Sequence, residues 1–187
     1  KQIASAAKML HALMRDVLDV NRFETGQFQI QTQAVNLTDV VRDTLPALAT
    51  LATEHHVSLS FQEETSAHWM LGDADRLKQC VLNLGSNGIK YNRKGGRLGV
   101  ELLTDAQQVL LHFTDEGAGM NPEQLAHLFE PFNRLGRAGQ GHGIGLVLTR
   151  QLVLAMGGEL RVESQEGTGT RMTLAFPAIL HPVPDRS

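Results

Sequence analysis

Apolar residues recur along much of this chain with the period of a helix. In the first segment they stand three and four residues apart, at Ile3, Ala6, Leu10, Leu13, Val17 and Val20. This spacing predicts an amphipathic helix that ends near Gly26, because glycine commonly follows the last helical turn. The helix could pack on a partner helix in a bundle or on its own domain, and the pattern is too short to separate the two.

Further helices are expected where the same period returns, over residues 37–55, 73–92, 121–129 and 143–156. Asn36 or Thr38 can cap the first of them and Asp73 the second, since short polar side chains accept hydrogen bonds from unpaired backbone N–H groups. Pro122 suits the first turn of the third helix, where no intrahelical N–H bond is lost. These capping positions support the helix boundaries.

Strands are expected where apolar and polar residues alternate, over residues 57–62, 69–71, 97–103, 108–114, 159–164 and 170–176. Residues 132–141 are polar and contain glycine without an apolar period, which predicts a mobile loop. The tail 177–187 is rich in proline and is expected to be a linker. The chain therefore combines strands and helices in one domain with a short helical appendage.

Composition narrows the function classes. The chain has 187 residues, 42% of them apolar and 20% charged, with a net charge of −3. A slightly negative net charge gives no electrostatic support for nucleic-acid binding. No apolar run approaches the roughly 20 residues that a membrane-spanning helix needs. Cys80 is the only cysteine, which excludes an internal disulfide and favours a buried structural thiol. We expect a cytoplasmic, reducing setting without membrane contact by this chain.

The helix expected over residues 73–92 carries a polar stripe beside an apolar one. Asn83, Asn87 and Lys90 lie four and three residues apart and so share one face, with Tyr91 next to them. An amide oxygen suits Mg²⁺, which takes few protein ligands, and Lys90 can meet a phosphate. Tyr91 can offer its ring to a purine or its hydroxyl to a phosphate. Asparagine and lysine on a helix are also commonly just solvated.

Two glycine-rich turns follow. Residues 115–119 (DEGAG) come after an apolar strand, so Asp115 could accept a hydrogen bond from the exocyclic amine of adenine while Gly117 and Gly119 let the base approach. Residues 141–145 (GHGIG) lead into a helix, whose first amides can bind phosphates. Thr170 could hold Asp115 or a bridging water. Each motif alone could also serve folding, as a turn or a hairpin.

Together these motifs resemble the nucleotide-binding boxes of sensor histidine kinases. Residues 83–92 (NLGSNGIKYN) resemble the N-box, residues 115–119 the first glycine box and residues 128–132 (LFEPF) the F-box. The second and third glycine boxes are matched by residues 141–146 (GHGIGL) and 167–170 (GTGT). The match extends over roughly residues 7–178. Gly85 and Gly88 depart from the family pattern and are expected to loosen the N-box helix by up to about 1 kcal/mol each.

The resemblance implies the Bergerat ATP-binding fold of the GHKL superfamily, an α+β two-layer sandwich with a mixed five-stranded sheet and three helices. It implies ATP and Mg²⁺ as cofactors, with Asn87 holding the metal and Asn83 supporting the site. Catalytic roles would fall to Asn83 and Lys90. Residues implied to contact the nucleotide are Asn87, Lys90, Tyr91, Asp115, Gly117, Gly119, Phe132, Arg134, Gly141, His142, Gly143, Ile144, Gly145, Leu146 and Thr170.

The loop over residues 132–141 would be the ATP lid. Arg134 or Arg137 could reach the γ-phosphate from it, although neither lies in a tight motif. Phe129 and Phe132 would latch the lid to the domain, or they could simply be core aromatics. The lid lacks the clustered serine and arginine common in other members of the family.

The resemblance also predicts a domain organisation. Residues 1–30 would be the second helix of a dimerisation and phosphoacceptor domain, residues 31–178 the catalytic domain and residues 179–187 a tail. No histidine of this chain lies in a phosphoacceptor box, so the phosphorylated histidine is expected on a missing upstream helix. The expected partners are that phosphoacceptor domain, a response regulator or receiver domain, and a second copy in a full-length homodimer, which could itself be membrane-anchored.

Three functions are compatible with these motifs. The first is the catalytic half of a histidine autokinase. The second is a module that senses ATP through the same residues without transferring phosphate. The third is a GHKL ATPase or a serine-directed, anti-sigma-type kinase, against which the helix at the N-terminus speaks.

Overall fold

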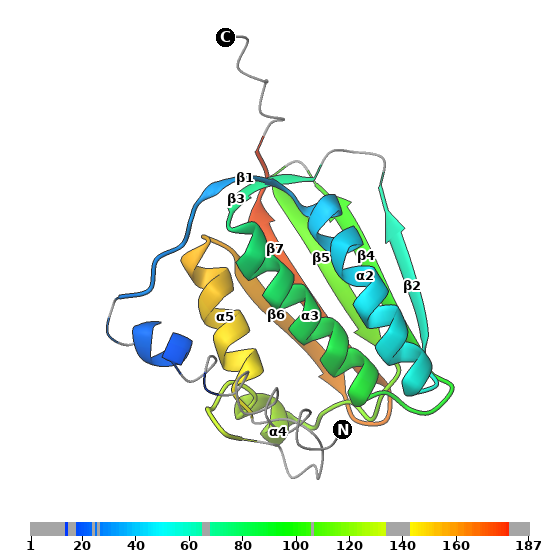
Figure 1. Ribbon diagram of the computed structural model, residues 1–187. Coiled ribbons are helices and arrows are strands. Elements are labelled where there is room, and N and C mark those ends of the chain that lie inside the picture. The colour runs from blue at the N-terminus through cyan, green and yellow to red at the C-terminus, as the bar shows by residue number, and fades with distance from the viewer. Residues whose placement is uncertain are drawn as a thin grey trace, which may run out of the picture.

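A mixed five-stranded sheet forms one layer of the domain (Figure 1). The computed structural model describes Met14, Thr25 and residues 18–23, 27–64, 68–105, 107–133 and 143–179. The strands follow the order β2 (Ser58–Glu63), β4 (Arg97–Thr104), β5 (Gln108–Asp115), β7 (Gly169–Pro177), β6 (Glu159–Gln165). β2 runs parallel to β4, and all other neighbours are antiparallel. The sheet expected from the sequence is confirmed.

A small second sheet pairs β1 (Gln33–Asn36) with β3 (Trp69–Gly72) in antiparallel register. The sequence pattern predicted β3 but not β1, because four residues with a single buried side chain, Val35, give no readable alternation. Ala178 adds a bridge to Met70 in this sheet. The segment ahead of α2 and the residue that follows β7 are thereby held together.

Three helices cover one face of the main sheet, α2 (Leu37–Glu54), α3 (Ala74–Lys90) and α5 (Gly145–Ala155) (Figure 1). Asn36 caps α2 by accepting from the backbone N–H of Thr38, and Asp73 caps α3 by accepting from Asp75 and Arg76. The fourth helix, α4 (Pro122–Ala126), is shorter than expected because residues 127–129 form turns. Sheet and helices together confirm the two-layer α+β fold.

The two glycines that depart from the N-box pattern lie where α3 packs most closely on its neighbours. An added Cβ at Gly85 would come within 2.6 Å of Leu48 Cδ1 on α2. At Gly88 it would come within 2.7 Å of Leu98 Cδ1 on β4. Both leucines are almost fully buried. The helix-weakening glycines therefore make room for core leucines, which offsets their cost in helix propensity.

A side-chain cluster joins residues that precede β1 to the start of α3. Residues 18–23 are helical, and Asp19 forms an ion pair with Arg76 at the start of α3, 3.0 Å between Oδ2 and Nη1. The Arg76 guanidinium lies 4.8 Å from the centroid of Phe28, which stacks on Phe23 at 3.8 Å. Most of the expected helix over residues 3–20 lies outside the described residues, so the predicted domain boundary at residue 30 stays a prediction.

The tail also lies mostly outside the described part of the chain, which ends at Ile179. Within that part, no helix has both the length and the apolar composition to cross a membrane.

Candidate nucleotide-binding site

The polar stripe of α3 faces away from the core. Leu77, Cys80, Val81 and Leu84 are fully buried on the opposite stripe and anchor the helix. Asn83 and Asn87 are half-buried, whereas Lys90 is exposed and Tyr91, the C-cap residue, is 38% exposed. Because the buried stripe fixes the rotation of the helix, the two amides keep a defined direction. Burial raises the pKa of the Cys80 thiol to about 12, which fits the expected structural role of this residue.

The side chain of Asn83 joins α3 to α5. Its Nδ2 donates to Thr149 Oγ1 at 2.8 Å, and Thr149 is 2% exposed. Its Oδ1 lies against Gly145, where an added Cβ would come within 2.5 Å of it. The N-box and the second glycine box, distant in sequence, are therefore in direct contact. Thr149 was not among the predicted site residues, since a threonine inside an apolar helical pattern gives no signal of its own.

Asp115 ends β5 and organises the first glycine turn. Its Oδ1 accepts hydrogen bonds from the backbone N–H groups of Gly117 at 2.8 Å and Thr170 at 3.2 Å. Gly119 has φ +63°, and an added Cβ there would lie 1.9 Å from the carbonyl oxygen of Gln165. Only glycine fits such a contact. The first glycine turn is thus pressed against the turn that joins β6 to β7.

Thr170 meets Asp115 through its backbone N–H group, as a register partner across β5 and β7. Its hydroxyl is hydrogen-bonded to Ser164 Oγ at 2.8 Å, and Ser164 in turn accepts from the N–H of Met120. Ser164 was missed by sequence reasoning because it lies near the end of β6, outside every recognised motif. It connects the first and third glycine turns.

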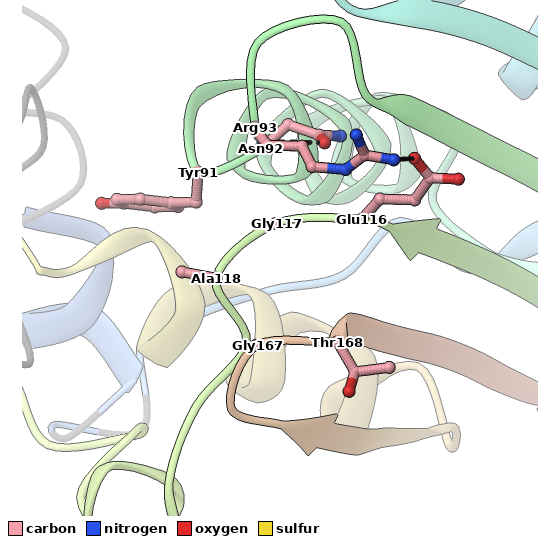
Figure 2. A pocket seen from close by; sticks show the side chains of 8 residues that line it. All are labelled: Tyr91, Asn92, Arg93, Glu116, Gly117, Ala118, Gly167 and Thr168. Atoms are coloured by element: carbon pink, nitrogen blue, oxygen red, sulfur yellow. Dashed lines mark hydrogen bonds and ion pairs between the residues drawn. The ribbon is translucent and has the colours of Figure 1, made fainter.

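A cavity of about 640 Å³ opens beside these turns. Figure 2 shows the Tyr91 side chain at one end and the ion pair between Arg93 and Glu116, 2.6 Å long, at the other. Gly117 lines the middle, where an added Cβ would come within 2.3 Å of the backbone oxygen of Tyr91. The remaining lining residues are Asn92, Ala118, Gly167 and Thr168.

The start of α5 has no side-chain cap, since its N-cap residue is Ile144, which is 3% exposed. Gly143, with φ +70°, accepts a hydrogen bond from the N–H of Phe132 at 3.1 Å. The Leu146 side chain packs on the hydrophobic core. These residues bring the end of the F-box and the start of α5 together.

Phe132 is 68% exposed, so the alternative that it is a core aromatic is wrong. Phe129 is half-buried, and the Arg150 guanidinium lies 4.8 Å from its ring centroid. Arg134, Arg137, Gly141 and His142 lie outside the described residues, as does nearly all of the expected lid. Their implied roles stay predictions.

The side-chain oxygens of the site suit a cation that is bound mainly by water and phosphate. Among the described residues, no three His, Cys, Asp or Glu side chains form a group that could hold a metal ion by themselves. Mg²⁺ needs only one or two protein oxygens, which an asparagine amide can supply, and completes its octahedron with other ligands. An added Cβ at Gly117, Gly119 or Gly145 would meet atoms of neighbouring segments, so these glycines let the segments around the site pack closely. The residues therefore fit a magnesium nucleotide.

Comparison with known proteins decides the family. Residues 72–179, more than half of the chain, match the family described as histidine kinase-, DNA gyrase B- and HSP90-like ATPases. The chain belongs to this family. All the described elements of the site, from α3 to β7, lie within the matched range. Membership of an ATPase family supports ATP as the nucleotide.

Similar members of the family are sensor histidine kinases. Sensor histidine kinase GacS of Pseudomonas protegens is 32% identical over 185 residues, which cover 93% of this chain and 20% of GacS. The chain thus spans about a fifth of that relative's length. The solved structure of the mycobacterial sensor histidine kinase MprB matches 80% of this chain and 99% of its own, with TM-score 0.70 and 28% identity.

Full-length ShkA in complex with AMPPNP has the same fold, with TM-score 0.82 and 24% identity. It covers 96% of this chain and 38% of its own.

Proposed function

We propose that this chain is the ATP-binding catalytic domain of a two-component sensor histidine kinase, which transfers the γ-phosphate of Mg-ATP to a histidine of a phosphoacceptor domain. The observation that carries the proposal is the contact of Asn83 on α3 with Gly145 and Thr149 on α5. It unites the N-box amides with the start of a helix that has no side-chain cap. The ends of α3 and β5 and the start of α5 lie at one edge of the domain (Figure 1).

Phosphoryl transfer from ATP asks the protein mainly for positioning and for neutralisation of charge. The first backbone N–H groups of α5 would bind phosphate oxygens, and Lys90 would add a positive charge beside them. Asn87 would hold Mg²⁺ and Asn83 would support the same end of the site. Bound Mg²⁺ would supply charge neutralisation on the phosphates.

The base would bind at the other end of the site. Asp115 would accept from the exocyclic amine of adenine, because two backbone N–H groups already hold its carboxylate in place. Tyr91 would lie against the nucleotide, and Gly117, Gly119 and Thr170 would shape the space around it. Residues of the lid and its hinges would complete the site. They are Phe132, Arg134, Gly141, His142, Gly143, Ile144 and Leu146.

The nucleophile would be an imidazole supplied by the phosphoacceptor domain, so this chain needs no base to activate water. The resemblance implies a carboxylate at position 83 in the ATP-hydrolysing members of the superfamily. Here that position is Asn83, whose Nδ2 donates to Thr149. A neutral amide is too weak a base to take a proton from water, which argues against a self-sufficient ATPase. A response regulator, a homodimer and a cytoplasmic location complete the proposal.

The test uses the longer protein that contains the phosphoacceptor histidine. It is incubated with γ-labelled Mg-ATP, and the label is examined for the acid lability and base stability of phosphohistidine. We expect such label in the wild type, none in Asn87→Ala, and wild-type labelling in the control Ser86→Ala on the same helix. Nucleotide binding without any label would contradict the kinase and favour a module that senses ATP.

A further inference from the structure

Asp115, Thr170 and Ser164 stand in one row across the main sheet. Thr170 on β7 is the register partner of Asp115 on β5 and of Ser164 on β6. Side chains of directly paired residues lie on the same face of a sheet. Leu174, four positions after Thr170 on the same face of β7, is fully buried in the core, so this is the face that the helices cover. Thr170 therefore lies between Asp115, where the base is proposed to bind, and Ser164.

The hydroxyl group of Ser164 has three hydrogen-bond contacts. Its Oγ lies 2.9 Å from the backbone oxygen of Gly169, 2.9 Å from the backbone nitrogen of Met120 and 2.8 Å from Oγ1 of Thr170. A hydroxyl group has one proton to donate and two lone pairs with which to accept. Three contacts therefore use its full capacity.

These three contacts decide the direction of the Thr170 hydroxyl proton. The carbonyl group of Gly169 only accepts, so it takes the proton of Ser164, and the N–H group of Met120 only donates. The third contact is then a hydrogen bond only if Thr170 donates to Ser164. Any other assignment leaves one contact unmade at a place where Gly169 is buried and Thr170 is 9% exposed, which is unfavourable.

The order of the strands gives this proton assignment a consequence for the site. β7 lies between β5 and β6, so a proton directed to Ser164 on β6 points away from Asp115 on β5. On the side of Asp115 the Thr170 oxygen then has only lone pairs to offer. The carboxylate of Asp115 is also an acceptor. Two neighbouring acceptors therefore face the place where the base is proposed to bind.

We propose that Ser164 is a positioning residue that commits the hydroxyl proton of Thr170, so that Thr170 and Asp115 together select purines with an amine at C6. This role rests on the proposed function, whose nucleotide it specifies further. An exocyclic amine has two N–H groups and can donate to both oxygens, as in adenine. A carbonyl oxygen at the same ring position, as in guanine or hypoxanthine, would meet two acceptors and no donor.

A purely structural role for Ser164 makes a different prediction. If its hydroxyl group only joined the turns around Met120 and Gly169, its loss would weaken the binding of every nucleotide alike. If it commits the Thr170 proton, its loss lets that proton turn toward the base, where it can be donated to a carbonyl oxygen. The ratio of the affinities for an amino and an oxo nucleotide therefore separates the two roles.

The test measures binding of ADP and IDP, with Mg²⁺, to the whole chain by calorimetry. IDP differs from ADP by carrying hypoxanthine, with a carbonyl group in place of the C6 amine. We expect the wild type to prefer ADP and the ratio of ADP to IDP affinity to fall about tenfold in Ser164→Ala, the gain of one hydrogen bond to the carbonyl oxygen. A loss that both nucleotides share does not change this ratio.

Two controls belong to this measurement. Ser164→Thr keeps the hydroxyl group on a side chain that suits a strand and should restore the ratio of the wild type. Glu163→Ala changes the next residue of β6, whose side chain lies on the other face of the sheet, and should leave the ratio unchanged.

A second variant tests the lone pairs of Thr170 directly and covers a Ser164→Ala chain that folds poorly. Thr170→Val has nearly the same shape but neither accepts nor donates. We expect ADP to bind about tenfold more weakly, because one acceptor for the amine is lost, and IDP to bind no more weakly than it does to the wild type. Equal losses for ADP and IDP in this variant would show that Thr170 does not distinguish the two bases.

The outcomes separate the role of Ser164 from the proposed function. If the wild type binds ADP but the ratio is the same in Ser164→Ala, or IDP binds to none of these chains, Ser164 does not commit the proton and the proposed function stands. If the wild type binds neither nucleotide, the proposed function is overturned and the role of Ser164 falls with it. A lower ratio in Ser164→Ala that Ser164→Thr restores supports the proposal.

Discussion

At the scale of single residues, the site depends on short-range contacts between segments far apart in sequence. Asp115 accepts hydrogen bonds from backbone N–H groups of its own turn and of β7. Asn83 on α3 donates a hydrogen bond to Thr149 on α5. Sequence motifs predicted Asp115 and Asn83 because polar residues beside glycine turns stand out. They could not predict Thr149 or Ser164, since these bury single hydroxyl groups inside ordinary helix and strand patterns.

Asp115 gives the first prediction. Asp115→Asn keeps an oxygen that can accept from Gly117 and Thr170 but replaces the other oxygen with a donor, which would face the adenine amine. We expect ATP binding to weaken by about 2 kcal/mol, roughly 30-fold, the cost of one charge-assisted hydrogen bond. Calorimetry with ATP measures this.

Asp115→Ala is the companion variant. It removes both turn contacts and should lower the thermal stability of the domain as well as the affinity, whereas Asp115→Asn should leave the unfolding temperature nearly unchanged. Equal ATP affinity in the asparagine variant and the wild type would show that this carboxylate does not recognise adenine.

At the scale of elements, the helices and most strands follow from the apolar period and from capping residues. Asp73 and Asn36 were readable as caps, and both perform that role. β1 was not predicted, because its pairing with β3 depends on a distant strand and not on its own pattern. The glycines of α3 were expected only to weaken the helix. The sequence could not show that Leu48 and Leu98 occupy the space they leave.

Gly85 tests this packing. Alanine at position 85 would gain about 1 kcal/mol in helix propensity, but its Cβ would press on the buried Leu48, and overpacking costs about 1–3 kcal/mol. We expect Gly85→Ala to lower the free energy of unfolding by about 1 kcal/mol, as measured by urea denaturation. Ser86→Ala, at the next position of α3, should be neutral or slightly stabilising. A more stable Gly85→Ala would mean that Leu48 can move aside freely.

The contact between the N-terminal helical segment and α3 gives a third prediction. The Asp19 side chain is 4% exposed and ion-paired with Arg76 at 3.0 Å, whereas Arg22 lies at 3.9 Å and is 60% exposed. Breaking a buried pair costs several kcal/mol, and Arg76 at 26% exposure reduces that cost. We expect Asp19→Ala and Arg76→Ala each to destabilise the chain by about 1–3 kcal/mol in urea denaturation.

Two comparisons check that the loss comes from the pair itself. Arg22→Ala should have almost no effect, because exposed ion pairs contribute little. The double variant of Asp19 and Arg76 should cost clearly less than the sum of the single ones. Strictly additive losses would show that the two side chains act independently.

At the scale of the whole molecule, a mixed five-stranded sheet with three helices was expected from the resemblance, and this fold is confirmed. The family was predictable because its motifs occur together and in order. The contact of the N-terminal segment with α3 could not be predicted, because it depends on Asp19, Arg76 and two phenylalanines that form no motif. The lid expected over residues 132–141 lies almost entirely outside the described residues and remains a prediction.

Cys80 provides a probe of the whole domain. It is fully buried with a pKa raised to about 12, so the folded thiol should not react with iodoacetamide at pH 8, and labelling should report global unfolding. Nucleotide at about 100 times its Kd stabilises the folded state by about 2.7 kcal/mol, so Mg-AMPPNP should slow labelling roughly 100-fold. Fast labelling of the folded chain would contradict the burial of this thiol.

The central claim is that the amides of α3, the start of α5 and the glycine turns form one site for a magnesium nucleotide. Calorimetric titration of the chain with AMPPNP, with and without Mg²⁺, tests it most directly. The account predicts one nucleotide per chain, tighter with Mg²⁺, with the Mg²⁺-dependent gain lost in Asn87→Ala and retained in Ser86→Ala. No binding, or binding that neither Mg²⁺ nor Asn87→Ala changes, would contradict it.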